Sequence, residues 1–142
     1  MRIAISFVFL LVVEATAVAA TQSPCLKYEP ALVSLSGTLI SRTFAGPPNY
    51  ESISKGDRPE RALLLLLDEP VCVEGDPASA LSQETELGVV LVQIGPPDSG
   101  WKFVGRRVLI TGTLMHRHTG HHRTAVLLNL KEVRAKPDAG HK

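Results

Sequence analysis

Apolar residues along the chain fall into five short runs, separated by segments rich in glycine, proline and polar residues. This pattern is typical of β-strands joined by turns. The predicted strands are residues 32–40, 62–73, 88–94, 107–115 and 124–130. The unbroken apolar run at 62–67 fits a buried helix equally well by periodicity, but its short length and the flanking prolines favour a strand.

One short helix is predicted at residues 100–104, where Asp98 or Ser99 could cap its start and Gly105 ends it. Five strands with a helix between the third and fourth predict an all-β domain, a small five-stranded OB-like Greek-key barrel. An SH3-like barrel and a small sandwich remain alternatives. OB-folds bind ligands on strands two and three and through the loops after strands one and four.

The loop after the first strand, residues 45–59, is rich in glycine and proline, and we expect no regular element in it. The loop after the fourth strand contains a cluster of histidines. The two most unusual segments of the chain are therefore predicted to lie where an OB-fold usually binds.

The N-terminal residues 1–20 have the three parts of a secretory signal peptide: a basic start, an apolar run at 3–13 and small residues at 15–20. We expect an exported protein, periplasmic or secreted, with no membrane span in the mature chain. Residues 21–134 then form a single domain, and residues 135–142 form a disordered tail.

Two cysteines remain after cleavage, Cys25 and Cys72. An even number of cysteines in an oxidising compartment predicts a disulfide between them.

The charge is distributed unevenly along the chain. Residues 21–100 carry five basic against eleven acidic side chains, and residues 101–142 carry nine against two, with all five histidines. This indicates either a basic surface on the C-terminal part or two regions that neutralise each other in the fold.

Four histidines lie within seven residues, at positions 116, 118, 121 and 122. Strand alternation with a two-residue turn at Thr119-Gly120 would place three of them on one face. The predicted metal ligands are His116, His118 and His121, for Zn²⁺, Ni²⁺ or Cu²⁺. Residues 106–131 contain no Asp or Glu, so any supporting carboxylate must come from elsewhere in the fold.

Two alternatives to a metal site stay open for the histidine segment. It is either a polar loop that has no specific ligand or whose rings hydrogen-bond to the barrel, or a surface for an anion or glycan built with Arg117 and Arg123. In the first loop, Asn49 and Tyr50 could hydrogen-bond and stack on a sugar. The predicted ligand-binding residues are Asn49, Tyr50, Arg117, His122 and Arg123.

The sequence contains no G-x-S-x-G, Walker or HExxH motif, so we expect no enzyme, and a metal-dependent hydrolase is the one enzymatic interpretation left open. No cofactor other than a metal ion is indicated. The mature chain has five aromatic residues, few for the stacking that single-stranded nucleic acids need, and export also argues against such a partner.

Several motifs resemble a known family. They are Cys-Leu-Lys-Tyr-Glu-Pro at 25–30, Leu-Ser-Gly-Thr-Leu at 35–39, the Gly-Pro-Pro-Asn-Tyr-Glu-Ser segment at 46–52, Leu-Asp-Glu-Pro-Val-Cys-Val at 67–73 and His-Thr-Gly-His-His-Arg-Thr at 118–124. The chain resembles the small exported bacterial domains catalogued as domain of unknown function 4431. The resemblance implies bacterial origin and export, and it brings no known activity or catalytic residue.

These observations predict an exported soluble binding module of the bacterial cell envelope. It would contact an envelope glycan or a protein through the first loop and the histidine-rich hairpin. The alternative is a metal-binding protein that uses the histidine cluster.

Overall fold

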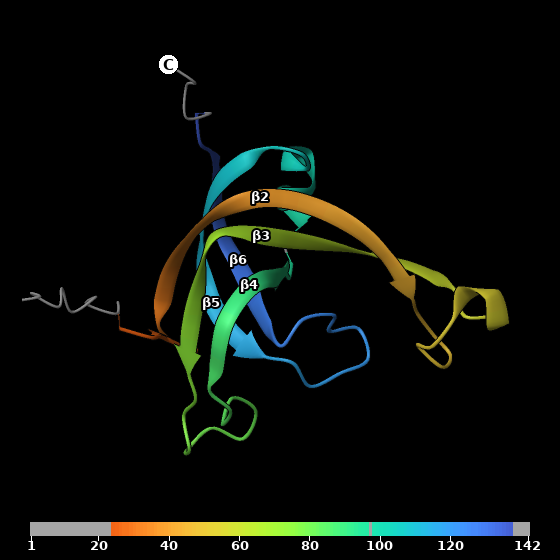
Figure 1. Ribbon diagram of the computed structural model, residues 1–142, viewed down its shortest axis with the longest axis horizontal. Helices are drawn as coiled ribbons and strands as arrows, with labels where there is room; N and C mark the ends of the chain where they lie inside the picture. Colours follow the sequence, from red (N-terminus) through yellow and green to blue (C-terminus); the bar gives the residue numbers. More distant parts are fainter. Residues whose placement is uncertain (1–23, 97, 138–142) are drawn as a thin grey trace, which may run out of the picture.

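The structure, a computed structural model, describes residues 24–96 and 98–137 (Figure 1). Its elements are β1 (Leu26–Lys27), β2 (Leu32–Ala45), η1 (Ile53–Lys55), β3 (Pro59–Glu74), β4 (Glu86–Ile94), η2 (Asp98–Phe103), β5 (Arg107–His116) and β6 (Val126–Ala135). The all-β prediction is confirmed, and the predicted short helix is the 3₁₀-helix η2. The predicted signal peptide lies outside the described residues.

The five predicted strands correspond to β2–β6, and the structure adds the two-residue strand β1, which pairs in parallel with β3. The prediction of five strands was therefore one strand short, because two residues are too few to show an alternating pattern. The expectation of no regular element in residues 45–59 was also wrong, since η1 forms one 3₁₀ turn there.

The strands form one six-stranded sheet in the order β1-β3-β2-β5-β6-β4, and β3 also pairs with β4. This last pairing closes five strands into a ring. The β4–β6 pair is parallel, whereas the other pairs of the ring are antiparallel. The arrangement is compatible with the predicted OB-like barrel.

Alternating apolar residues fill the interior of the ring. In β5 every second residue is buried, as expected for a strand with one face on the core. The central cluster comprises Tyr28, Val33, Leu35, Leu39, Leu63, Leu65, Leu67, Val73, Val92, Ile94, Val108, Ile110, Leu114, Val126, Leu128 and Leu130. Leu64 and Leu127 are also buried but are not part of this cluster, so apolar residues are covered on the opposite face of the sheet as well.

Strands β2 and β3 continue beyond their predicted ends as a long antiparallel ribbon, with Ala45 opposite Pro59. Figure 1 shows this ribbon projecting past the ring of strands, with η1 at its tip. Near its other end, Gly37 pairs with both β3 and β5. A Cβ atom there would lie 2.2 Å from the carbonyl oxygen of Leu66, so only glycine fits this close approach.

The predicted disulfide between Cys25 and Cys72 is confirmed, with Cα atoms 4.7 Å apart. It fixes the start of the described chain to β3, beside the β1–β3 pair. At the other end, Ala135 still belongs to β6, and the Lys136 N–H donates to the Arg107 carbonyl at 2.9 Å. No helix among residues 24–96 and 98–137 is long and apolar enough to cross a membrane.

Candidate functional site

The tip of the β2–β3 ribbon is organised around the buried carboxylate of Asp57. Its Oδ1 accepts hydrogen bonds from the backbone N–H and the side-chain amide of Asn49, at 2.9 and 3.2 Å. Its Oδ2 accepts from the backbone N–H groups of Glu51 and Ser52, each at 2.8 Å. The hydrogen bonds from Ser52 and Asn49 hold the pKa of Asp57 below its usual range. Four hydrogen bonds to one carboxylate therefore hold the conformation of the tip.

Tyr50 extends from this tip toward the loop between β5 and β6. Its backbone has a φ of 61°, which is uncommon for a residue with a side chain. Its hydroxyl lies 2.9 Å from Nε2 of His121, and the two rings meet edge-on with centroids 5.2 Å apart. The backbone of Gly120 passes close to the same ring, since a Cβ there would lie 3.2 Å from it. The Tyr50 ring therefore lies directly against the histidine-containing loop.

His121 continues this contact toward β3. Its Nδ1 lies 2.7 Å from Oε1 of Glu60, and Oε2 of Glu60 accepts a 2.7 Å hydrogen bond from Arg123. Burial alone would raise the pKa of Glu60, but His121 and Arg123 outweigh it and lower that pKa. Tyr50, His121, Glu60 and Arg123 thus form one hydrogen-bonded chain.

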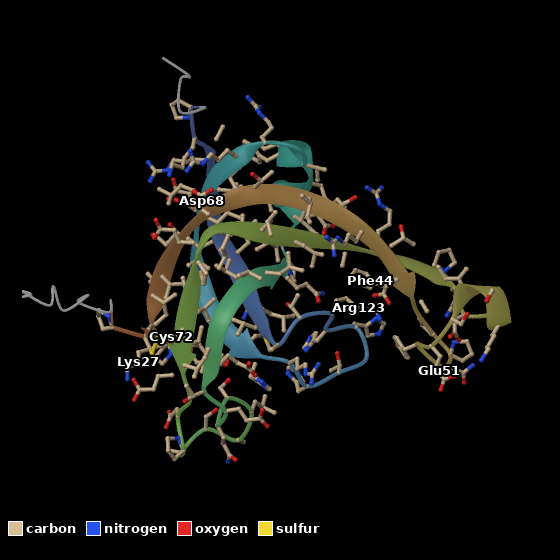
Figure 2. The ribbon with its side chains drawn as sticks, in the orientation of Figure 1. Lys27, Phe44, Glu51, Asp68, Cys72 and Arg123 are labelled. Carbon is tan, nitrogen blue, oxygen red and sulfur yellow. A yellow bond between two sulfur atoms is a disulfide. The ribbon has the colours of Figure 1, made fainter. Side chains whose placement is uncertain are left out.

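Arg123 lies under the ribbon. Its side chain is 8% exposed, and its guanidinium carbon is 5.2 Å from the ring centre of Phe44 and 5.5 Å from that of Tyr50. Figure 2 shows Arg123 and Phe44 close together between the ribbon and the loop. Arginine often stacks on aromatic faces in this way. Arg123 is therefore a structural residue of the junction.

Gln93 of β4 holds the loop between β5 and β6 through two side-chain hydrogen bonds. Its Oε1 accepts from the Arg123 N–H at 2.6 Å, and its Nε2 donates to the His121 carbonyl at 3.1 Å. Leu64 and Leu127 are the register partners of Gln93 on the two neighbouring strands, so all three side chains share one face of the sheet. The Gln93 hydrogen bonds therefore hold loop 117–125 against the face of the sheet that carries these two buried leucines.

The remaining two histidines of the loop pair with each other. The rings of His118 and His122 meet edge-on at 4.5 Å, and the His118 N–H donates to Nδ1 of His122 at 3.0 Å. Burial, followed by the charges of His118 and His121, lowers the pKa of His122. His118 and Arg117 are exposed at the surface.

The predicted convergence of His116, His118 and His121 was wrong. His116 contacts Glu86, His118 contacts His122, and His121 contacts Tyr50 and Glu60. The reason is the turn. β5 ends at His116 and β6 begins at Val126, so the connection is much longer than the two-residue turn assumed at Thr119-Gly120. The expectation that carboxylates must come from elsewhere in the fold is met by Glu60 and Glu86.

Of the predicted ligand-binding residues, Arg123 is buried against Glu60, and Asn49 donates its amide to Asp57. Asn49 and Arg117 are exposed, and Tyr50 and His122 are partly exposed. Sequence reasoning missed four residues that build the junction, namely Phe44, Asp57, Glu60 and Gln93. The sequence offered a signal for only one of these four residues: Gln93 is a polar residue inside the apolar run 88–94.

A second polar cluster lies where β5 ends. Nε2 of His116 is 2.9 Å from Oε1 of Glu86 and 3.7 Å from Oε2 of Glu84. Tyr28 lies edge-on to the His116 ring at 6.3 Å. Its buried hydroxyl has no hydrogen-bond partner within residues 24–96 and 98–137. Burial, followed by the negative charges of Glu86 and Glu84, raises the pKa of Tyr28 to about 12.

The fold and these sites define an all-β domain in which two loops, far apart in sequence, meet on one surface. Residues 91–134 match the family model described as Domain of unknown function (DUF4431). The match includes β5, loop 117–125 and most of β6, so the family resemblance is confirmed for the C-terminal part of the domain. No curated protein and no solved structure matches the chain.

Proposed function

We propose that this protein is an exported binding module of the bacterial cell envelope. It contacts an envelope glycan through one surface, formed by loop 46–58 at the ribbon tip and by loop 117–125. The observation that carries this proposal is the hydrogen bond between Tyr50 and His121, which joins the two loops. In OB-like domains these two loops are the usual binding edge.

The surface offers groups suited to a sugar that carries acidic substituents. Arg117 and His118 are exposed, and the His121 side chain is half-exposed, so cationic and hydrogen-bonding groups lie beside the Tyr50 ring. The Asp57 hydrogen bonds fix the ribbon tip before any ligand arrives. A preorganised loop loses less conformational entropy on binding than a flexible one. The proposal assigns binding to this surface, and no catalysis.

Export is part of the same proposal. The disulfide between Cys25 and Cys72 supports an oxidising compartment. The N-terminal pattern of a signal peptide supports the same route.

Retention on isolated bacterial envelopes tests the proposal. The wild-type protein should sediment with the envelopes, and replacing both Arg117 and His118 by alanine should release it. Arg106→Ala is the control, because Arg106 is also an exposed arginine and lies next to the other end of β5. Protease treatment of the envelopes separates the two partner classes, since a glycan survives it and a protein partner does not. Unchanged retention of the double variant contradicts the proposal.

A further inference from the structure

Four segments of the chain meet at the end of β5, apart from the Tyr50–His121 junction. His116 is the last residue of β5, and Glu86 is the first residue of β4. Glu84 lies in loop 75–85, which precedes β4, and Tyr28 directly follows β1. Chemistry-bearing side chains from distant parts of the sequence therefore face one another here.

Loop 75–85 is built to hold Glu84 in this position. The buried Ser82 hydroxyl accepts a hydrogen bond from the His116 N–H at 3.3 Å, which fastens the loop to β5. At the loop's start, the Gly75 N–H donates to the Thr85 hydroxyl at 2.9 Å. A Cβ on Gly75 would lie 2.1 Å from the Gln83 carbonyl oxygen, so only glycine at position 75 allows this conformation of the loop.

The donor atoms have the spacing of a metal site. Nε2 of His116 lies 2.9 Å from Glu86 and 3.7 Å from Glu84, and the three donor atoms lie within 4.8 Å of one another. Ligands about 2.1 Å from a tetrahedral Zn²⁺ ion are about 3.4 Å apart. The two observed separations from His116 lie on either side of that value. The two carboxylates also balance the charge of a divalent ion.

Tyr28 gives an independent reason to expect a ligand. It is 4% exposed, and its hydroxyl has no hydrogen-bond partner among the described residues. An unpaired buried hydroxyl is unfavourable, and such groups in a native structure often mark an ordered water or ion. The Tyr28 ring packs edge-on against His116. After burial, the negative charges of Glu86 and Glu84 also raise the pKa of the Tyr28 hydroxyl.

We propose that His116, Glu84 and Glu86 bind a Zn²⁺ ion. One imidazole nitrogen and two carboxylate oxygens are ordinary zinc donors, and three protein ligands leave the fourth position for water. The Tyr28 hydroxyl hydrogen-bonds to that water. The site shares only His116 with the ligand set expected from the sequence, and it does not rest on the proposed glycan surface.

Calorimetry and thermal unfolding of the purified protein, stripped with chelator and titrated with zinc chloride, test this site. The wild-type protein should bind one equivalent and melt at a higher temperature. Glu84→Gln should weaken binding by about tenfold or more, and Tyr28→Phe by about tenfold. The Glu84 side chain is 76% exposed, so its replacement does not threaten the fold.

The matched control replaces His118 and His121 together by glutamine, which should leave zinc affinity unchanged. Two results would overturn the proposal. The first is no binding by the wild-type protein at roughly tenfold zinc excess. The second is binding that survives Glu84→Gln but is lost in the His118/His121 variant. Anomalous diffraction at the zinc edge then locates the ion beside His116 or elsewhere.

Discussion

The Tyr50 hydroxyl and Nε2 of His121 lie 2.9 Å apart, although 71 residues separate them in the chain. This contact joins the tip of the β2–β3 ribbon to the loop between β5 and β6. Each segment alone is a surface loop, and surface loops are usually the most mobile parts of a domain. Joined through this contact, the two loops form one surface of fixed shape.

A double-mutant cycle measures this contact. Tyr50→Phe keeps the ring packing and removes the hydroxyl, and His121→Ala removes the partner ring. We expect a coupling free energy of about 0.5–1.5 kcal/mol, typical of one hydrogen bond, from urea unfolding of the four proteins. Tyr50→Phe paired with Arg106→Ala is the control and should show additive effects. Additive effects in the Tyr50–His121 cycle as well would mean that the contact does not join the loops.

Replacing Arg123 should lower the free energy of unfolding much more than replacing Arg117, although both lie in loop 117–125. Arg123 is buried and paired with Glu60, so Arg123→Ala leaves a partly buried carboxylate without its cation. We expect a loss of about 3 kcal/mol, at the low end for buried pairs because the Glu60 side chain is 31% exposed. Arg117 is exposed, and Arg117→Ala should change the free energy of unfolding by less than about 0.5 kcal/mol. Denaturant unfolding compares them, and equal effects would contradict the structural role given to Arg123.

The disulfide should contribute strongly to the stability of this small domain. It closes a loop between Cys25 and Cys72, 47 residues apart, and the chain-entropy model gives about 4 kcal/mol for a loop of that size. The Cys25→Ser/Cys72→Ser double variant should therefore unfold at much lower urea concentration. The wild-type protein with reductant should behave like the variant, and reductant should not affect the variant itself. A midpoint that reductant leaves unchanged in the wild-type protein would show that the bond is absent or contributes little.

The sequence predicted best what is encoded locally. The alternation in β5 and the apolar run in β3 follow from side chains facing the core, and both strands lie where they were expected. Two cysteines leave only one pairing to choose. β1 could not be found, because two residues held by strand pairing and a nearby disulfide show no periodicity.

The histidine site could not be predicted for a different reason. The directions of the His118, His121 and His122 rings depend on the length of the turn, and the two-residue turn assumed at Thr119-Gly120 misplaced them. His116 lies in β5, so its direction follows the alternation of that strand. The partners of these histidines, Glu60, Glu84 and Glu86, come from segments that are 30 to 61 residues away. No local pattern shows which carboxylate a folded chain brings to which imidazole.

Acid should weaken the ribbon tip through Asp57. Its carboxylate accepts four hydrogen bonds, and its pKa in the folded protein is lowered. A carboxyl group with a lowered folded pKa binds its proton more readily in the unfolded chain. Its contribution to stability is therefore complete above its ordinary pKa of about 4 and disappears as the pH falls through the lowered value.

Asp57→Asn tests this, because an amide places an N–H group where the backbone donors of Glu51 or Ser52 need an acceptor. The variant should be less stable at neutral pH, and the difference from wild type should shrink as the pH falls from about 5 to about 2. Urea unfolding across that range measures it, and Asp98→Asn in η2 corrects for the loss of one exposed carboxylate. A difference that stays constant down to the acid limit would show that the Asp57 carboxylate is not preferentially stabilised in the folded protein.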